Sequence, residues 1–239
     1  RYVTGVQTCA LPILSLVDEG GRVIEGNTLL AVIAWLALKD AVARNSADNN
    51  KDGPEYPLRV AVTVGATGAV EEIAKGFGAE VSRTRQDPRS LMEFLLRPGQ
   101  EALFAGDGEG GFIFPRFQPA YDAMFTLAKV FEFLAGEGLA LSSVVDSLDI
   151  PPMVRRAVTC PWEHKGRVMR ILAQESEGTR REFIDGLRLF RDDGWVLVLP
   201  DPAEATVHVY SEASTHEAAC DHAERLAERI KEIAGFNDK

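Results

Sequence analysis

The feature that most constrains the fold is a strand–helix–strand pattern near the middle of the chain. Residues 59–64 (RVAVTV) and 79–84 (AEVSRT) have the composition of strands, and residues 69–77 (AVEEIAKGF) between them have helical spacing. Glycines stand at the junctions (Gly65, Gly68 and Gly78). This pattern is typical of a βαβ unit, so the sequence predicts an α/β fold.

Further elements are predicted on both sides of this unit. Residues 13–18 and 23–25 are expected to form two short strands around a turn, and Asn27 is expected to cap a helix that runs to Ala43. After the unit, short strands are expected at 102–106 and 112–114, and helices at 121–134 and 142–148.

The last quarter of the chain changes character. A helix is predicted at 165–173, followed by strands at 186–190, 195–199 and 205–213, the first two joined by a hairpin turn. Ser214 and Glu217 are expected to form a capping box for a final helix that Gly235 ends. These elements predict a small α+β domain, an antiparallel sheet with helices on one face.

Composition excludes several classes of protein. The chain has 239 residues, 46% of them hydrophobic, and a net charge of −10, which argues against nucleic acid or an anionic membrane as a partner. Its three scattered cysteines favour neither a disulfide framework nor a zinc site, so we expect a reducing, cytoplasmic location. The most apolar run, residues 28–38, is too short to span a bilayer and predicts a buried helix.

Two segments are expected to lie outside the folded units. Residues 1–13 (RYVTGVQTCALPI) differ in character from the rest of the chain and resemble translated sequencing-adapter sequence, so we expect them to be non-native and the natural N-terminus to be missing. Residues 45–57 are polar, rich in Asn, Asp, Gly and Pro, and predict a linker.

Several stretches, taken in order, resemble the later part of the α-D-phosphohexomutase superfamily, which contains the phosphomannomutases and phosphoglucomutases. These stretches are residues 16–27, 59–84, 105–114, 121–135, 141–145 and 184–213. The resemblance implies an α/β architecture with the end of one α/β/α mutase domain, one complete α/β/α mutase domain, and a small α+β domain similar to the TATA-box-binding protein. The implied ranges are 14–44 for the end of domain 2, 58–152 for domain 3 and 153–239 for domain 4.

The resemblance also implies a chemistry. Members of this superfamily move a phosphoryl group between the 1- and 6-positions of mannose or glucose phosphates. Their phosphorylated serine and aspartate-rich magnesium loop would both lie outside this sequence, so we expect no cofactor in this chain and no turnover by it alone. The implied partners are a hexose phosphate or sugar nucleotide and the missing N-terminal domains of the same polypeptide.

Two loops of the chain resemble binding loops of the family at corresponding positions. The sugar-recognition loop Gly-Glu-x-Ser-Gly-His corresponds to residues 106–111 (GDGEGG). Asp107 keeps a carboxylate for sugar hydroxyls, Glu109 replaces the serine, and Gly111 replaces the histidine. Arg85 stands where the family has a lysine that contacts substrate.

The phosphate loop Arg-Pro-Ser-x-Thr-Glu-Pro corresponds to residues 199–205 (LPDPAEA). Leu199 replaces the arginine, Pro200 and Glu204 are kept, and Asp201 replaces the serine, so the guanidinium and both hydroxyls are lost. Asp201 is expected to repel a phosphate dianion at a cost of about 1 kcal/mol or more when the contact is partly shielded from water. The loop is therefore expected to keep its fold and to have lost its ligand.

Other interpretations remain open. The degraded loops resemble the mutase-like region of certain mannose-1-phosphate guanylyltransferases, which implies a non-catalytic accessory module, and a structural scaffold is a third interpretation. The loop at 106–111 could be a plain glycine turn, but it lacks the ligand spacing of a calcium site. Residues 65–69 lack a complete nucleotide-binding motif, and His216 with Cys220 fits a helix surface better than a metal pair.

Overall fold

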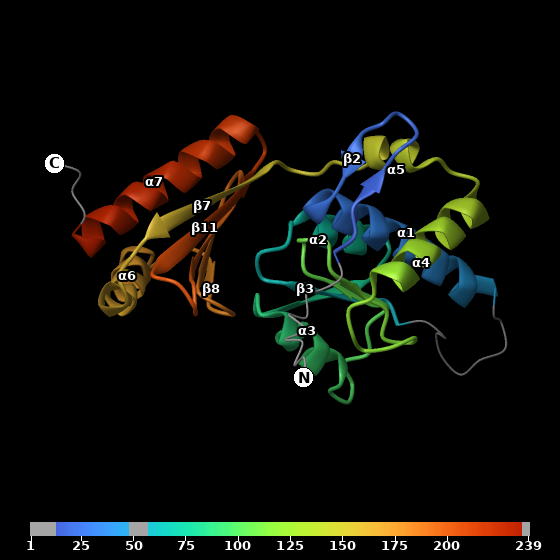
Figure 1. Ribbon diagram of the computed structural model, residues 1–239, viewed down its shortest axis with the longest axis horizontal. Helices are drawn as coiled ribbons and strands as arrows, with labels where there is room; N and C mark the ends of the chain where they lie inside the picture. Colours follow the sequence, from blue (N-terminus) through green and yellow to red (C-terminus); the bar gives the residue numbers. More distant parts are fainter. Residues whose placement is uncertain (1–12, 48–56, 236–239) are drawn as a thin grey trace, which may run out of the picture.

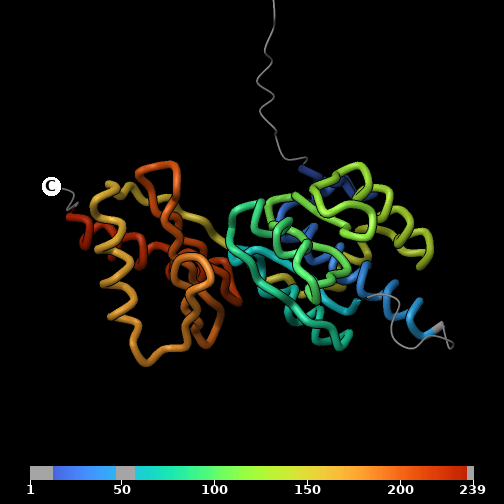
Figure 2. Tube along the Cα trace, turned by 90° about the horizontal axis from the view of Figure 1, so that it is seen from below, coloured from blue at the N-terminus to red at the C-terminus, as the bar shows by residue number. Residues whose placement is uncertain are grey.

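The computed structural model describes residues 13–47 and 57–235, which form two units lying side by side (Figure 1). We call residues 13–47 and 57–149 the N-terminal unit and residues 152–235 the C-terminal unit. Figure 2 shows the same two lobes from below, joined by the segment near residue 150. Residues 1–12, expected to be adapter-like, and most of the expected linker lie outside the described residues.

The N-terminal unit contains a four-stranded sheet in the order β4-β3-β5-β6. The central strand β3 (Arg59–Thr63) pairs in parallel with β4 (Glu80–Thr84) and β5 (Phe104–Gly106), and β6 (Phe112–Ile113) is antiparallel to β5. Helix α2 (Ala69–Gly76) connects β3 to β4. The predicted βαβ unit is confirmed.

The other elements of the N-terminal unit surround this sheet. They are β1 (Leu16–Val17), β2 (Val23–Ile24), α1 (Gly26–Ala47), α3 (Pro88–Leu95), α4 (Ala123–Glu137) and α5 (Leu141–Ser147). Helix α3 was not predicted. It begins where Asp87 accepts a hydrogen bond from the backbone N–H of Arg89, with Pro88 in the first helical position.

Helix α1 fills the core of the N-terminal unit. Leu29, Leu30 and Ile33 are fully buried and belong to one hydrophobic cluster with Val60 and Phe104 of the sheet. The expectation that this segment is too short to span a bilayer is wrong, because residues 26–46 form a helix that is long and apolar enough to do so, with 56% of its apolar window buried inside the protein. The predicted buried helix is confirmed, and its burial accounts for its apolar composition.

The start of α1 differs from the prediction. The helix begins at Gly26, so Asn27 lies inside it instead of capping it. The side-chain oxygen of Asn27 accepts a hydrogen bond of 2.8 Å from the backbone N–H of Thr67. Asn27 therefore ties α1 to the loop after β3, a tertiary contact that local spacing does not reveal.

The C-terminal unit is a five-stranded antiparallel sheet in the order β7-β11-β10-β9-β8. Its strands are β7 (Met153–Thr159), β8 (Arg181–Glu182), β9 (Leu187–Arg191), β10 (Gly194–Pro200) and β11 (Thr206–Ala213). The predicted hairpin joins β9 to β10. Strands β7 and β8 were not predicted.

The two faces of this sheet have different neighbours. Val196, Val198 and Val209 point to one face and pack against α6 (Trp162–Glu175) and α7 (His216–Ala234). Figure 1 shows both helices on the side of the sheet away from the N-terminal unit. The opposite face, which carries Leu197 and Tyr210 in a cluster with Val64 of the N-terminal unit, forms the contact between the units.

The ends of α7 confirm one prediction and correct another. Gly235 ends the helix in the left-handed conformation with φ of 84°, as predicted. The predicted capping box of Ser214 and Glu217 is wrong, because the N-cap is Thr215, whose hydroxyl accepts from the backbone N–H of Ala218. The register of the cap is shifted by one residue.

Candidate functional site

A cavity of about 540 Å³ lies between the two units at the carboxyl ends of β4 and β5. Fourteen residues line it: Arg85, Gln86, Asp87, Pro88, Asp107 and Glu109 from the N-terminal unit, and Arg155, Asp185, Leu199, Pro200, Asp201, Pro202, His208 and Tyr210 from the C-terminal unit. The cavity thus brings together both loops singled out in the sequence. Glu204 is the one residue of the predicted set that is not part of this lining.

The loop after β5 fixes Asp107. Gly108 and Gly110 adopt positive φ angles of 78° and 103°, and they fold the loop so that Asp107 Oδ1 accepts from the N–H groups of Glu109 (2.7 Å) and Gly111 (2.9 Å). Burial raises the pKa of Asp107, and these two hydrogen bonds oppose the rise. The carboxylate is an acceptor held at the cavity wall by its own loop.

Gly111 is required by the packing of this loop. A Cβ at position 111 would collide with the carboxylate of Asp107 and lie 2.6 Å from Cε1 of Tyr121. A glycine at position 111 therefore allows Asp107 to fold inward against Tyr121. The family resemblance drew attention to this position, and the structure supplies the steric reason for a glycine there.

Glu109 meets a cation that the sequence analysis missed. Its carboxylate lies 3.4 Å from Nη1 of Arg155, whose guanidinium also lies over the ring of Tyr210 at 5.1 Å. Arg155 is on β7, and this strand was not predicted. The alternation in MVRRAVT, residues 153–159, is the signal that could have placed Arg155 on the face toward the N-terminal unit.

In the loop at 199–205, the carboxylate of Asp201 is hydrogen-bonded to the loop's own backbone and to His208. Asp201 Oδ1 accepts from the N–H groups of Ala203 (2.7 Å) and Glu204 (2.8 Å), and Oδ2 lies 2.9 Å from Nε2 of His208. The hydrogen bond from Ala203, followed by that from His208, lowers the pKa of Asp201 to about 2. The negative charge is thus largely engaged within the loop and by His208.

Lys165 supports the same loop from beneath. Its buried ammonium donates to the carbonyl oxygens of Asp201 (2.6 Å) and Glu204, and it lies 3.7 Å above the ring of Trp162. The lysine comes from α6, far from the loop in sequence. It therefore holds the loop in one conformation with its charge directed at the backbone.

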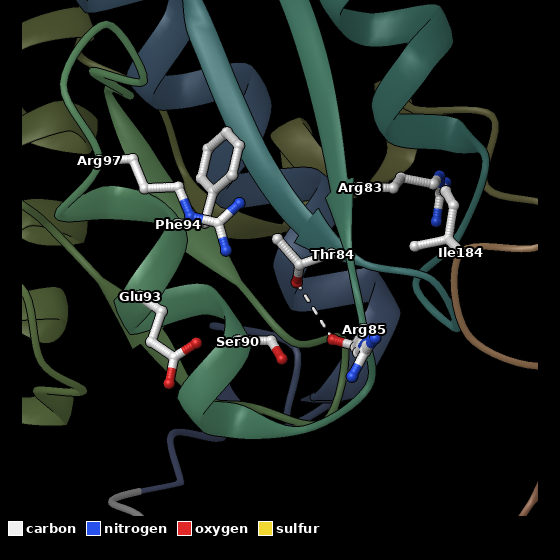
Figure 3. Close-up of a pocket in the computed structure, with 8 residues that line it drawn as sticks. All are labelled: Arg83, Thr84, Arg85, Ser90, Glu93, Phe94, Arg97 and Ile184. Carbon is white, nitrogen blue, oxygen red and sulfur yellow. Dashed lines mark hydrogen bonds between the residues drawn. The ribbon is translucent and has the colours of Figure 1, made fainter.

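Arg85 lies between the cavity and a neighbouring pocket of about 410 Å³. Figure 3 shows Arg85 with Ser90, Glu93 and Arg97 around that pocket, while Arg83 lies toward Ile184. The side chain of Arg85 is exposed and forms no ion pair with any residue in 13–47 or 57–235. It is free to meet a ligand.

The cavity has a guanidinium group on its C-terminal side. Arg155 reaches the cavity from β7, and it lines the cavity together with the loop at 199–205, which contains no arginine. Several acids of the lining are committed elsewhere, since Asp87 caps α3 and Asp185 accepts from the backbone N–H of Gln86 at 3.0 Å. The arrangement can bind a polyhydroxylated ligand and one negative group.

No metal site accompanies this cavity in the part of the chain that the structure describes. Groups of three or more His, Cys, Asp or Glu side chains placed to hold an ion do not occur there. His216 and Cys220 lie 3.4 Å apart on α7, without a third ligand of these types among the described residues.

Comparison with known proteins agrees with this geometry. Residues 25–149 match the family described as phosphoglucomutase/phosphomannomutase, alpha/beta/alpha domain III. A phosphoglucomutase/phosphomannomutase of Thermococcus kodakarensis is 29% identical over 209 residues, which are 87% of this chain and 42% of that protein. The chain thus spans less than half the length of the curated relatives it matches.

Solved structures show the same fold. A phosphoglucomutase/phosphomannomutase family protein from Burkholderia thailandensis has a TM-score of 0.72 and 18% identity, covering 94% of this chain and 45% of that one. Aspergillus fumigatus N-acetylphosphoglucosamine mutase, solved with GlcNAc-6P and magnesium, has a TM-score of 0.62 and 17% identity, covering 93% and 47%. The family match, the shared fold and the cavity between the units lead to one conclusion: the chain belongs to the phosphoglucomutase/phosphomannomutase family, in the α-D-phosphohexomutase superfamily.

Proposed function

We propose that this chain forms the sugar-binding part of a sugar-phosphate mutase and that its ligand is a hexose phosphate. The observation that supports the proposal is the meeting of Asp107, Glu109, Arg155 and the loop at 199–205 around one cavity. The reaction of the whole protein would be the transfer of a phosphoryl group between the 1- and 6-positions of a mannose or glucose phosphate.

Each group has a chemical role in this proposal. Asp107 and Glu109 would accept hydrogen bonds from sugar hydroxyls, as carboxylates commonly do. Arg155 and Arg85 would bind the phosphate, because guanidinium groups donate two parallel hydrogen bonds to an oxyanion. The loop at 199–205 would form a wall and contribute no cation, so we expect weaker phosphate binding than an arginine in that loop would give.

We expect the chemical step to depend on groups from outside this chain. Phosphoryl transfer needs a phosphoryl donor and positive charge to stabilise the transferring group. We propose that both would come from a longer polypeptide of which this chain is a part, and that the 239-residue chain binds sugar phosphate without converting it.

A second candidate is a non-catalytic sugar-sensing module, such as the mutase-like region of a mannose-1-phosphate guanylyltransferase. The pair Leu199 and Asp201 favours it, because the family resemblance places an arginine and a serine for phosphate at these two positions. Under this proposal a sugar nucleotide would bind at least as well as a hexose phosphate.

Calorimetric titration of the chain tests both candidates. Glucose 6-phosphate, N-acetylglucosamine 6-phosphate, glucose and GDP-mannose would be compared at one ionic strength. Hexose phosphate binding that falls roughly tenfold in Arg155→Gln supports the first proposal, because a hydrogen bond to a charged group contributes about 1.5 kcal/mol or more. Preference for GDP-mannose supports the second.

The controls separate the cavity from the surface. Arg229→Gln changes a half-buried arginine of α7 that pairs with Glu175 and Glu232 away from the cavity, and it should leave binding unchanged. Asp107→Asn should weaken binding of glucose and of hexose phosphates alike. Absence of binding by all four ligands would contradict both candidates, and so would binding in Arg155→Gln and Asp107→Asn that is unchanged from that of the original chain.

A further inference from the structure

A second cavity between the units shares no lining residue with the sugar cavity. Its volume is about 460 Å³. The N-terminal unit contributes Gly68, Glu71, Glu72, Val81 and Arg83, and the C-terminal unit contributes Arg180, Glu182, Ile184, Arg188, Phe190 and Trp195. None of these residues has a role in the function proposed above.

The wall of this cavity contains a buried guanidinium without an acceptor. Arg188, on β9, is 3% exposed, and its Nε atom has no hydrogen-bond partner among the residues the structure describes. Its guanidinium carbon lies 4.1 Å from the ring centroid of Trp195 and 5.2 Å from that of Phe190. The aromatic rings cover the guanidinium but accept none of its in-plane hydrogen bonds.

The environment of Arg188 makes this arrangement costly. Burial, and then the nearby charge of Arg83, lower the pKa of Arg188 to about 10. No carboxylate within the described ranges lies at ion-pair distance from it. Buried charges in proteins are normally paired and hydrogen-bonded, and Arg188 is not. A bound oxyanion would supply the missing partner.

Arg180 places a second guanidinium at the rim of the cavity. It is exposed, and its guanidinium carbon lies 4.3 Å from the ring centroid of Phe190. Arg83, by contrast, is fully engaged, because it pairs with Glu71 and donates to four backbone carbonyl groups. Two arginines, one buried and one exposed, are therefore available to a ligand.

The acids near Arg188 are mostly committed to other groups. Glu71 pairs with Arg83, Glu212 accepts from Gly68 and Trp195, and Glu72 lies 3.9 Å from Lys75. Glu182 stands opposite Arg188 on β8 and is the acid that competes with a ligand. Its removal should strengthen an anion's attraction to the cavity.

We propose that this second cavity binds a small oxyanion, a carboxylate or phosphate group, with Arg188 at its base and Arg180 at its rim. Planar guanidinium groups bind both kinds of oxyanion through paired charge-assisted hydrogen bonds. Since residues of both units line the cavity, a bound anion also stabilises the contact between the units.

Trp195 provides the readout, because the guanidinium of Arg188 stacks on its indole. In a Trp35→Phe, Trp162→Phe background it is the one remaining tryptophan. We would titrate inorganic phosphate and citrate, with chloride keeping the ionic strength constant, and follow Trp195 emission and the melting temperature. We expect a saturable emission change and a rising melting temperature with at least one of the two anions.

Matched variants assign the binding to this cavity. Arg188→Met should weaken it roughly ten- to a hundredfold and Arg180→Gln severalfold, whereas Glu182→Gln should tighten it. Arg180 is exposed, so its variant remains informative if Arg188→Met does not fold. A saturable response to phosphate identifies the site as one for phosphate groups, and a saturable response to citrate identifies it as one for carboxylates.

Arg155→Gln keeps the second cavity intact and changes the sugar cavity. If phosphate binding is lost in Arg155→Gln and kept in both Arg188→Met and Arg180→Gln, the anion occupies the sugar cavity, and this proposal fails while the proposed function stands. The absence of a saturable response to either probe also overturns it, without bearing on sugar binding.

Discussion

Glu212 of the C-terminal unit accepts two hydrogen bonds from the backbone N–H of Gly68, which precedes the first residue of α2 in the N-terminal unit. The distances are 2.9 and 3.1 Å to its two carboxylate oxygens, and one of these oxygens also accepts from Nε1 of Trp195 at 2.7 Å. Glu212 as a whole residue is 3% exposed. One acidic side chain therefore caps a helix across the contact between the units, with the charge that a helix N-terminus favours.

We predict that Glu212→Ala lowers the free energy of unfolding by about 2 to 4 kcal/mol, because it leaves two buried donors without an acceptor. Urea unfolding followed by tryptophan fluorescence measures the change. Glu228→Ala, on the exposed face of α7, is the matched control and should change stability by less than about 0.5 kcal/mol. Equal effects of the two substitutions would contradict the role assigned to Glu212.

Arg83 supports the loop between β3 and α2. Its guanidinium donates to the carbonyl oxygens of residues 63, 64, 66 and 67 and pairs with Glu71. We predict that Arg83→Met destabilises the chain by about 3 kcal/mol or more, since four carbonyl groups and a carboxylate lose their donor.

Amide hydrogen exchange locates this effect. Protection at residues 65–68 should fall more than protection in α7. Arg89→Met, at an exposed position of α3, should leave both regions unchanged. A uniform loss of protection would indicate general destabilisation and contradict a specific role in this loop.

We predict that Asp201 makes the free energy of unfolding depend on pH in the acid range. Its pKa of about 2 lies below the ordinary value of 3.8, so its contribution to stability is complete above about pH 4 and is lost as the pH falls toward 2. Asp201→Asn should flatten the dependence of stability on pH in that interval. Carbon-13 NMR titration of the Asp201 carboxyl group checks the cause, and a midpoint near 3.8 would contradict it.

Much of the fold could be predicted because its signals are local. The βαβ unit is evident from short-range periodicity and junction glycines, and the β9–β10 hairpin from its turn residues. Strand β7 was missed because most of its residues are exposed and its pairing partner, β11, lies far along the chain. Residues such as Asn27, whose side chain bonds across the fold, were assigned local roles that the structure does not confirm.

The sequence indicated the two loops of the candidate site, but it did not indicate the basic side chains that approach these loops from other elements. Asp107 and Asp201 were singled out because the family resemblance rests on contiguous loop segments, and both residues line the cavity. Arg155, Lys165 and His208 approach those loops from other elements, so no spacing rule connects them. Whether an acid repels a ligand depends on where its carboxylate points. The carboxylate of Asp201 points toward the backbone of its own loop and toward His208.

The sugar loop provides the most direct test of local packing, because two of the chain's glycines differ sharply in the room around them. A Cβ at Gly111 would collide with Asp107 and Tyr121, whereas one at Gly136 in α4 would meet no atom within 4 Å. We predict that Gly111→Ala costs about 1 to 3 kcal/mol and weakens glucose binding by displacing Asp107. Gly136→Ala should instead stabilise by about 0.5 to 1 kcal/mol, since alanine favours a helix interior. Thermal unfolding and calorimetry of both variants measure these effects, and unchanged glucose affinity in a folded Gly111→Ala protein would show that the position of Asp107 does not govern sugar binding.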